Sequence, residues 1–204
     1  MTAPFDHADE DLWVFGYGSL MWRPGFAYKE RMPARLVGLH RALCVYSFVH
    51  RGTPEKPGLV LGLDRGGTCR GIAYRVDKTR RPETLAYLRD REQVTHVYRE
   101  LMRPVTLARA HAQRDGAAEP GPDAHTERVS ALVYAVDRSH PQYAGRLEFA
   151  EQLHLVRQGH GHSGANRDYV LATIKEIETQ GCFDAKLHRL AELLRGVHET
   201  HAAE

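Results

Sequence analysis

Two parts of the 204-residue sequence combine residue types and spacings that suit catalysis, and the first is a glycine turn. The stretch Val14-Phe15-Gly16-Tyr17-Gly18-Ser19-Leu20 places two glycines one residue apart, beside a tyrosine and a serine. Glycine permits positive φ angles and leaves no side chain between backbone N–H groups and a ligand. Several N–H groups in one tight turn suit a carboxylate or an oxyanion, and the hydroxyls can donate or accept. The alternative is an ordinary turn after a strand, with Trp22 packed in the core.

The second part is a glutamate on the apolar side of a predicted helix. At about 100° per residue, Leu85, Leu88 and Glu92 fall on one stripe of that helix. A carboxylate in the place of the next leucine faces a partner or a cavity. Burial without a paired cation raises its pKa toward the range that a general acid/base needs near neutral pH. Glu92 is therefore the candidate catalytic acid/base.

Two alternatives for Glu92 remain open at this point. It can belong to a buried salt bridge with Arg91, Arg89 or a distant arginine. It can also be an exposed glutamate that the helix dipole favours. Periodicity places Arg91 well round from the apolar stripe, on the flank beside Tyr87.

The other reactive side chains indicate no further site. His160 and His162 resemble a metal pair, but no third ligand lies near them in the sequence, and we expect no metal. Ser163 lacks the strand–turn–helix context of a hydrolase nucleophile. The three cysteines are odd in number and lack metal spacing, which is typical of free thiols in a reducing cytosol: Cys44, Cys69 and Cys182.

Composition favours one globular domain without a charged macromolecular partner. Hydrophobic residues make up 42% of the chain and charged residues 26%, with a net charge of +2. This balance is typical of globular proteins and implies neither nucleic acid nor an anionic membrane as a partner. No signal peptide is visible, and no apolar run approaches the roughly 20 residues of a membrane span. We expect a cytoplasmic single domain over 1–204, with a flexible N-terminus over 1–11.

The elements that must position these residues follow from periodicity and turn signals. Strands are predicted over 12–15, just before the glycine turn, and over 34–48 with a break near Gly38. Two more are predicted over 98–107 and 129–136. Residues 59–63 and 69–76 are predicted to form a hairpin around Asp64-Arg65-Gly66-Gly67. The polar segment 110–127 is expected to be a mobile loop.

Helices dominate the last third of the chain. They are predicted there over 146–157, from Asn166 as cap to Gly181, and from Asp184 onward. One earlier helix is predicted over 82–97, with Pro82 in its opening turn. Strands first and helices last favour an α+β fold, a small and mostly antiparallel sheet or barrel with helices packed on it. No alternating βαβ units are present, which argues against a doubly wound nucleotide-binding fold.

Six segments, in preserved order between about Leu12 and Leu187, resemble the ChaC-type γ-glutamylcyclotransferase family. They are residues 14–22, 47–61, 69–74, 87–92, 143–145 and 161–169. The glycine turn is shared with the wider cyclotransferase-like superfamily, whereas the His50-Arg51-Gly52-Thr53-Pro54 loop indicates the ChaC branch. The resemblance implies a small mixed or antiparallel β-barrel with surrounding helices. It also implies cleavage of glutathione, a small-molecule substrate, to 5-oxoproline and cysteinylglycine.

By that resemblance, the family's catalytic glutamate falls on Glu92 and its substrate turn on Val14 to Ser19. We take as substrate-binding positions Val14, Phe15, Gly16, Tyr17, Gly18, Ser19 and Leu20. Tyr143 joins them because it lies in a matching segment and its hydroxyl can reach a pocket. The reaction needs no metal or organic cofactor.

The chemistry would be an internal acyl transfer, in which the α-amine of the γ-glutamyl unit attacks its own γ-carbonyl. Glu92 would take a proton from the amine and return one to the departing amine. The turn would grip the α-carboxylate or stabilise the oxyanion, and the sequence leaves both roles open. Two alternatives also stay open: a cyclotransferase for other γ-glutamyl amino acids or γ-glutamylamines, and a non-catalytic regulatory binding protein.

Overall fold

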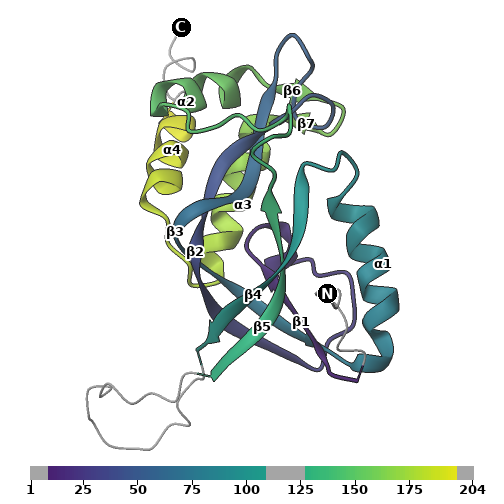
Figure 1. Ribbon diagram of the computed structural model, residues 1–204. Helices are drawn as coiled ribbons and strands as arrows, with labels where there is room; N and C mark the ends of the chain where they lie inside the picture. Colours follow the sequence, from purple (N-terminus) through teal and green to yellow (C-terminus); the bar gives the residue numbers. More distant parts are fainter. Residues whose placement is uncertain (1–8, 109–126, 197–204) are drawn as a thin grey trace, which may run out of the picture. The chain divides into compact units, whose positions relative to one another are not determined.

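A closed barrel is the central feature of the structure, a computed structural model that describes residues 9–108 and 127–196 (Figure 1). The barrel strands within those ranges follow the order β1-β3-β2-β4-β5. Their bounds are Leu12–Gly16 for β1, Glu30–Ser47 for β2, Gly58–Val76 for β3, Tyr98–Leu107 for β4 and Glu127–Val136 for β5.

Contacts divide the chain into two compact units. The first comprises Met1–His40 with Arg65–Ala135, and the second comprises Arg41–Asp64 with Val136–Glu204. The long strands β2 and β3 contribute to both units. The prediction of a single domain stays a prediction.

Strand β1 fixes the position of the glycine turn, because β1 is paired with another strand on each of its two edges. It runs antiparallel to β3, from Leu12 opposite Val76 to Gly16 opposite Ile72, and parallel to β5. A hydrophobic cluster forms where Leu12 and Val14 meet side chains of β3, β5 and the first helix: Val76, Leu88, Leu132 and Tyr134. A buried strand paired on both edges fixes the position of the turn that follows it.

Helix α1 (Arg81–Glu92) lies alongside the barrel of the first unit (Figure 1). It has proline in its first turn, and the preceding 3-10 helix η2 (Lys78–Arg80) is capped by Asp77. Leu88 is fully buried in the barrel cluster, and Leu85 packs against it. The predicted apolar stripe is therefore confirmed, and it places Glu92 one helical turn after Leu88. The helix ends at Glu92, earlier than the predicted residue 97.

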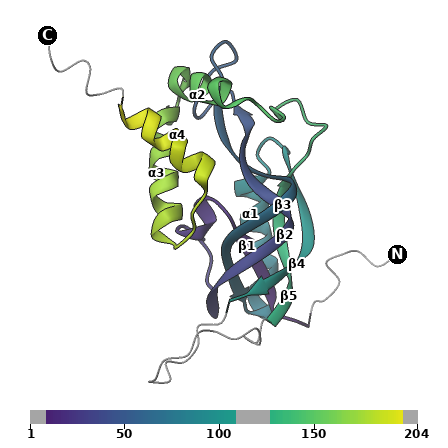
Figure 2. The ribbon, with the colours of Figure 1, turned by 90° about the vertical axis from the view of Figure 1, so that its left-hand side faces the viewer.

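Within its described residues, the second unit contains three helices that pack against one another: α2 (Phe149–Gln158), α3 (Asn166–Thr179) and α4 (Ala185–Arg195) (Figure 2). A short hairpin of β6 (His160–Gly161) and β7 (Gly164–Ala165) precedes α3. Helix α4 begins directly after Asp184, close to the predicted start, and the Asp184 carboxylate caps it by accepting from the amides of Lys186 and Leu187. Leu187, Leu190 and Leu194 lie on the buried face of that helix.

The predicted hairpin around Asp64-Arg65-Gly66-Gly67 is wrong. Strand β3 continues through these residues from Gly58 to Val76. Gly66 and Gly67 do take positive φ angles of 92° and 67°, but these angles bend the strand instead of reversing it. His40 Nδ1 lies 3.1 Å from Gly66 O at this bend. Strand β2 likewise continues through Gly38, whose φ is 91°.

The predicted cap of α3 is also wrong, because Asn166 is the first residue of the helix and Ala165 is its N-cap. The Asn166 side chain is buried instead and pairs with the backbone of Leu59. Its Oδ1 accepts from Leu59 N at 2.7 Å, and its Nδ2 donates to Leu59 O at 2.8 Å. The amide thus extends the edge of β3 in the manner of a neighbouring strand.

Two predicted flexible segments fall largely outside the described residues, namely 1–8 of the N-terminus and 110–126 of the polar segment. Asp11 is described, and it pairs with Lys29 and Arg75. No helix in the described ranges is long and apolar enough to cross a membrane. The same residues contain no group of three or more His, Cys, Asp or Glu side chains able to hold a metal ion.

Candidate functional site

The glycine turn leads from β1 directly into a 3-10 helix, η1 (Ser19–Met21). Its first hydrogen bond runs from Met21 N to Gly18 O at 2.8 Å, so the amides of Ser19 and Leu20 have no acceptor within the helix. A Cβ on Gly16 would lie 3.0 Å from Leu20 Cβ and 3.1 Å from Leu20 C. Glycine at residue 16 therefore allows the chain to fold back on itself and gather its amides in a small volume.

Most side chains of the turn point into the protein. Val14 and Phe15 are fully buried, and Tyr17 and Leu20 are nearly so. Ser19 is exposed. A ligand at this turn would therefore meet backbone amides and the Ser19 hydroxyl, whereas Val14 and Phe15 shape the turn from the core side.

Two contacts from β3 hold the turn in place. Tyr74 Oη donates to Met21 O at 2.7 Å, at the end of η1. Gly71 lies against the end of β1, where an added Cβ would overlap Gly16 O and approach the Phe15 ring to 2.7 Å. Both residues belong to a segment that the sequence resemblance included, and both act here on the shape of the turn.

Glu92 lies at the C-terminal end of α1 with 17% of its side chain exposed. Burial raises the pKa of this carboxyl above its ordinary value of 4.5, and the neighbouring Arg91 guanidinium opposes the rise without cancelling it. Arg91 Nε lies 3.2 Å from Glu92 Oε1. The salt bridge and the raised pKa, which the sequence posed as alternatives, are both present.

Arg91 joins this glutamate to the glycine turn. Its Nη2 donates to Ser19 Oγ at 2.8 Å, and its Nη1 donates to Tyr87 Oη at 2.8 Å and to Arg23 O at 2.6 Å. The predicted flank beside Tyr87 is confirmed. The link to Ser19 was not predicted, because no local pattern in the sequence connects residues 72 positions apart.

The loop after the turn closes over Tyr87. Gly25 has a φ of 76°, and a Cβ there would overlap the Tyr87 hydroxyl. Phe26 contacts the rings of Tyr74 and Tyr87 edge-on, with centroids 5.7 and 6.3 Å apart. Aromatic packing and the Arg91 bonds thus fix the same loop from two sides.

A second buried carboxylate lies near Glu92, on β4. Glu100 has 10% of its side chain exposed and accepts from both Nε and Nη2 of Arg89, at 2.9 and 3.0 Å. Tyr134 Oη donates to the same carboxylate at 3.1 Å. Burial raises the pKa of Tyr134, and the negative charges of Glu100 and Glu92 add to the rise. Arg89 therefore pairs with Glu100, whereas Arg91 pairs with Glu92.

Tyr143 belongs to the second unit, whereas the turn and Glu92 belong to the first. Its hydroxyl donates to Asp64 Oδ2 at 2.9 Å, and Arg138 Nε pairs with Asp64 Oδ1 at 2.6 Å. A backbone bridge to Val45 fixes the position of Tyr143. Its role toward a substrate stays a prediction.

Two of the remaining reactive residues, Ser163 and Cys44, lie in the second unit. Ser163 Oγ is 3.0 Å from His50 Nδ1, and Arg51 donates to Ser163 O. Burial raises the pKa of the Cys44 thiol to about 12. A thiol with that pKa stays protonated at neutral pH and is a poor nucleophile.

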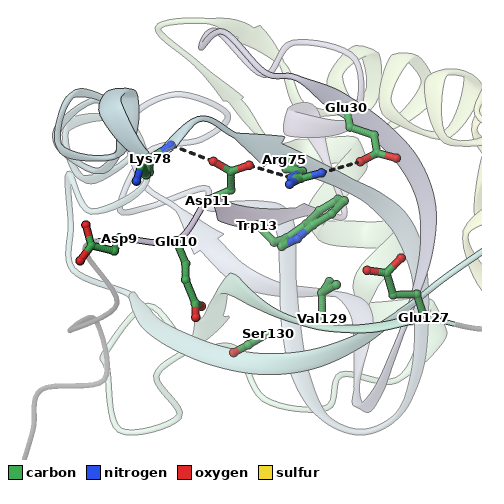
Figure 3. A pocket seen from close by; sticks show the side chains of 10 residues that line it. All are labelled: Asp9, Glu10, Asp11, Trp13, Glu30, Arg75, Lys78, Glu127, Val129 and Ser130. Atoms are coloured by element: carbon green, nitrogen blue, oxygen red, sulfur yellow. Dashed lines mark hydrogen bonds and ion pairs between the residues drawn. The ribbon is translucent and has the colours of Figure 1, made fainter.

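A cavity of about 580 Å³ opens at the beginning of β1, away from the turn that follows the end of this strand (Figure 3). Asp11 pairs with Arg75, Arg75 reaches Glu30, and Trp13 lies beside them. None of the predicted site residues lines this cavity, whose walls are Asp9, Glu10, Asp11, Trp13, Glu30, Arg75, Lys78, Glu127, Val129 and Ser130. It is separate from the candidate site.

Comparison with known proteins connects this geometry to a family. Glutathione-specific gamma-glutamylcyclotransferase of Escherichia coli (strain K12) is 32% identical over 88% of this chain and 71% of its own. Gamma-glutamylcyclotransferase 2-1 of Arabidopsis thaliana is 42% identical over 81% of this chain and 74% of its own. The crystal structure of a yeast gamma-glutamyl cyclotransferase specific to glutathione superposes with a TM-score of 0.74 at 23% identity. The superposition covers 92% of this chain and 96% of the yeast chain, and it confirms the predicted α+β fold. Residues 12–200 match the ChaC-like protein family, and the chain belongs to that family.

Proposed function

We propose that this protein is a glutathione-specific γ-glutamylcyclotransferase, which cleaves glutathione to 5-oxo-L-proline and L-cysteinylglycine. The names of the relatives support this substrate. The observation that carries the proposal is the part-buried Glu92 carboxylate, joined through one guanidinium to Ser19 of the glycine turn. A proton acceptor and a cluster of hydrogen-bond donors are what this reaction requires.

In the reaction, the α-amine of the γ-glutamyl unit forms a bond to its own γ-carbonyl carbon. The amide bond from that carbon to the cysteine nitrogen then breaks, and a five-membered lactam leaves with cysteinylglycine. Nucleophile and electrophile are tethered, so no covalent enzyme intermediate is needed. Holding the chain in the attack geometry supplies several kcal/mol of the barrier reduction.

Glu92 is the acid/base of this proposal. The α-amine must lose a proton before it can attack, and the departing cysteine nitrogen must gain one. A carboxylate whose pKa is raised by burial takes the first proton and returns it to the leaving group. General acid/base catalysis of this kind contributes about a hundredfold to ten-thousandfold in rate.

The glycine turn binds the γ-glutamyl unit in this proposal. The amides gathered between Gly16 and Leu20 and the Ser19 hydroxyl bind its α-carboxylate or the developing oxyanion. Val14, Phe15 and Tyr17 hold the backbone of the turn from the core. Tyr143 is proposed to contact the peptide body of glutathione. The proposal includes no metal, cofactor or nucleic acid, and it places the protein in the cytoplasm.

Incubation of the purified chain with glutathione tests the function directly. We expect 5-oxoproline and cysteinylglycine to appear in equal amounts. A panel of γ-glutamyl amino acids and γ-glutamylamines should be assayed in parallel, because the name of the Arabidopsis relative does not mention glutathione. Faster turnover of another panel member would assign that substrate instead. Saturable glutathione binding without either product would indicate a non-catalytic binding protein.

A further inference from the structure

Arg91 uses all three of its guanidinium nitrogens to connect parts of the candidate site. Nε faces Glu92 at 3.2 Å, Nη2 faces Ser19 at 2.8 Å, and Nη1 faces Tyr87 at 2.8 Å. The guanidinium is planar and its donors have fixed directions. Because Nε and Nη2 are bonded to the same carbon, the Glu92 carboxylate and the Ser19 hydroxyl lie beside neighbouring donors of one rigid group.

The bond between Arg91 and Ser19 has only one possible polarity. A guanidinium carries donors and no acceptor, so Ser19 Oγ must accept. The proton of the Ser19 hydroxyl is then left for another acceptor. Within residues 9–108 and 127–196, the structure gives this hydroxyl no second hydrogen-bond partner, and the side chain is exposed. A charge-assisted bond to the oxygen also polarises the O–H bond and makes it a stronger donor.

The same guanidinium acts on Glu92 through its charge. Burial raises the pKa of Glu92, and Arg91 is the group that opposes the rise. Removal of the positive charge would leave the effect of burial unopposed, and the pKa would rise further. The other arginine near this end of α1, Arg89, is committed to Glu100.

We propose that Arg91 is a positioning residue of the cyclisation: its guanidinium makes the Ser19 hydroxyl a fixed donor to an oxygen of the γ-glutamyl unit and holds the Glu92 carboxylate beside it. This inference rests on the proposed function. It assigns Arg91 an effect through two other residues, and it assigns Ser19 a donor role instead of an acceptor role. A purely structural Arg91 would only tie α1 to the loop at Arg23.

A double-mutant cycle on the full chain tests the inference, with Arg91→Met, Ser19→Ala, the double variant and Arg91→Lys assayed on glutathione. If Arg91 acts through Ser19, the decreases in kcat/KM of the two single variants have the same cause and do not multiply in the double variant. We expect each to lower kcat/KM by about tenfold or more, and the double variant to fall well short of the product of the two losses. Arg91→Met should also move the acidic limb of the pH profile to higher pH, whereas Ser19→Ala should not. Arg91→Lys keeps a charge near Glu92 and should leave the limb near its wild-type position while the rate stays low.

Arg75→Met is the matched control for the loss of a paired surface arginine. Arg75 pairs with Asp11 and Glu30 at the opposite end of β1 (Figure 3), so its loss should lower the melting temperature without changing the pH profile. Losses that multiply independently in the double variant, or an unmoved acidic limb in Arg91→Met, would overturn the inference. If Arg91→Met does not fold, wild-type kcat in Arg91→Lys would overturn it equally. Wild-type protein that releases no 5-oxoproline from any γ-glutamyl compound would refute the proposed function itself, and the inference with it.

Discussion

Arg89 and Glu100 form a two-point ion pair, with Nε and Nη2 at 2.9 and 3.0 Å from the two carboxylate oxygens. The pair engages Arg89 with Glu100, although Arg89 and Glu92 both lie in the last turn of α1. Glu92 is left with Arg91, whose charge is shared with Ser19, Tyr87 and a backbone carbonyl. Burial outweighs the charge of Arg91, so the pKa of Glu92 stays raised, and that is the property an acid/base near neutral pH requires.

Replacement of Glu92 by glutamine should remove the activity and preserve the fold. The amide has nearly the same shape, and its oxygen can still accept from Arg91. It cannot take a proton from the substrate amine, so we expect release of 5-oxoproline to fall at least about a hundredfold. The measurement is product formation alongside circular dichroism. Glu151→Gln, on the exposed side of α2, is the control and should retain wild-type turnover. Wild-type turnover in Glu92→Gln would disprove the assignment.

Stability should depend on pH in a way that this variant reveals. Because the folded-state pKa of Glu92 lies above 4.5, protonation favours the folded state. The stability from this group is fully present below the unfolded pKa and is lost as pH rises through the folded pKa. Glutamine does not titrate, so the melting temperature of Glu92→Gln minus that of wild type should increase between about pH 4 and pH 7. A difference that stays constant or decreases over this range would mean that Glu92 is not held with a raised pKa.

Local pattern was sufficient to predict the candidate acid/base and the turn. The spacing of Leu85, Leu88 and Glu92 puts them on one face of a helix. In the structure, Leu85 and Leu88 of that face pack in the barrel cluster. The start of the last helix at Asp184 was likewise predicted, and the structure places the Asp184 carboxylate there as the cap of α4. These features depend on residues a few positions apart, which is the range over which helix periodicity and capping operate.

Features that depend on distant partners could not be predicted in the same way. Asn166 has the residue type of a helix cap, but its amide pairs with Leu59, 107 positions away. The glycines at 66 and 67 have turn chemistry, but β3 continues through them from Gly58 to Val76. The bond between Arg91 and Ser19 could not be predicted, because the local sequence around Arg91 would be the same if the arginine were solvated on the flank of the helix.

Substitution of Gly71 by alanine should destabilise the protein through the turn. A Cβ at this position would overlap Gly16 O and lie 2.7 Å from the Phe15 ring, neither of which can move freely. Overpacking of this kind costs about 1–3 kcal/mol. Denaturant unfolding measures the loss, and kcat should fall as well if the turn binds substrate. Gly196→Ala is the control, since an added Cβ there meets nothing within 4 Å. Unchanged stability in Gly71→Ala would contradict the close approach of β3 to the turn.

Replacement of Tyr143 by phenylalanine separates a structural role from a substrate contact. The tyrosine donates to Asp64, which keeps Arg138 as a partner when the hydroxyl is removed. We therefore expect a loss of stability of about 1–2 kcal/mol, near the low end of the contribution of a hydrogen bond to a charged group, because Asp64 keeps its second donor. If the hydroxyl also contacts the peptide body of glutathione, KM for glutathione should rise by a factor of about 5 to 30 while kcat changes little, because the contact would be equal in the ground state and transition state. Asp64→Asn serves as the comparison, because it weakens the same hydrogen bond and leaves the Tyr143 hydroxyl in place. A KM increase in both variants would attribute the effect to the local structure, whereas an increase in Tyr143→Phe alone would support the contact. Unchanged KM in Tyr143→Phe would remove this residue from the site.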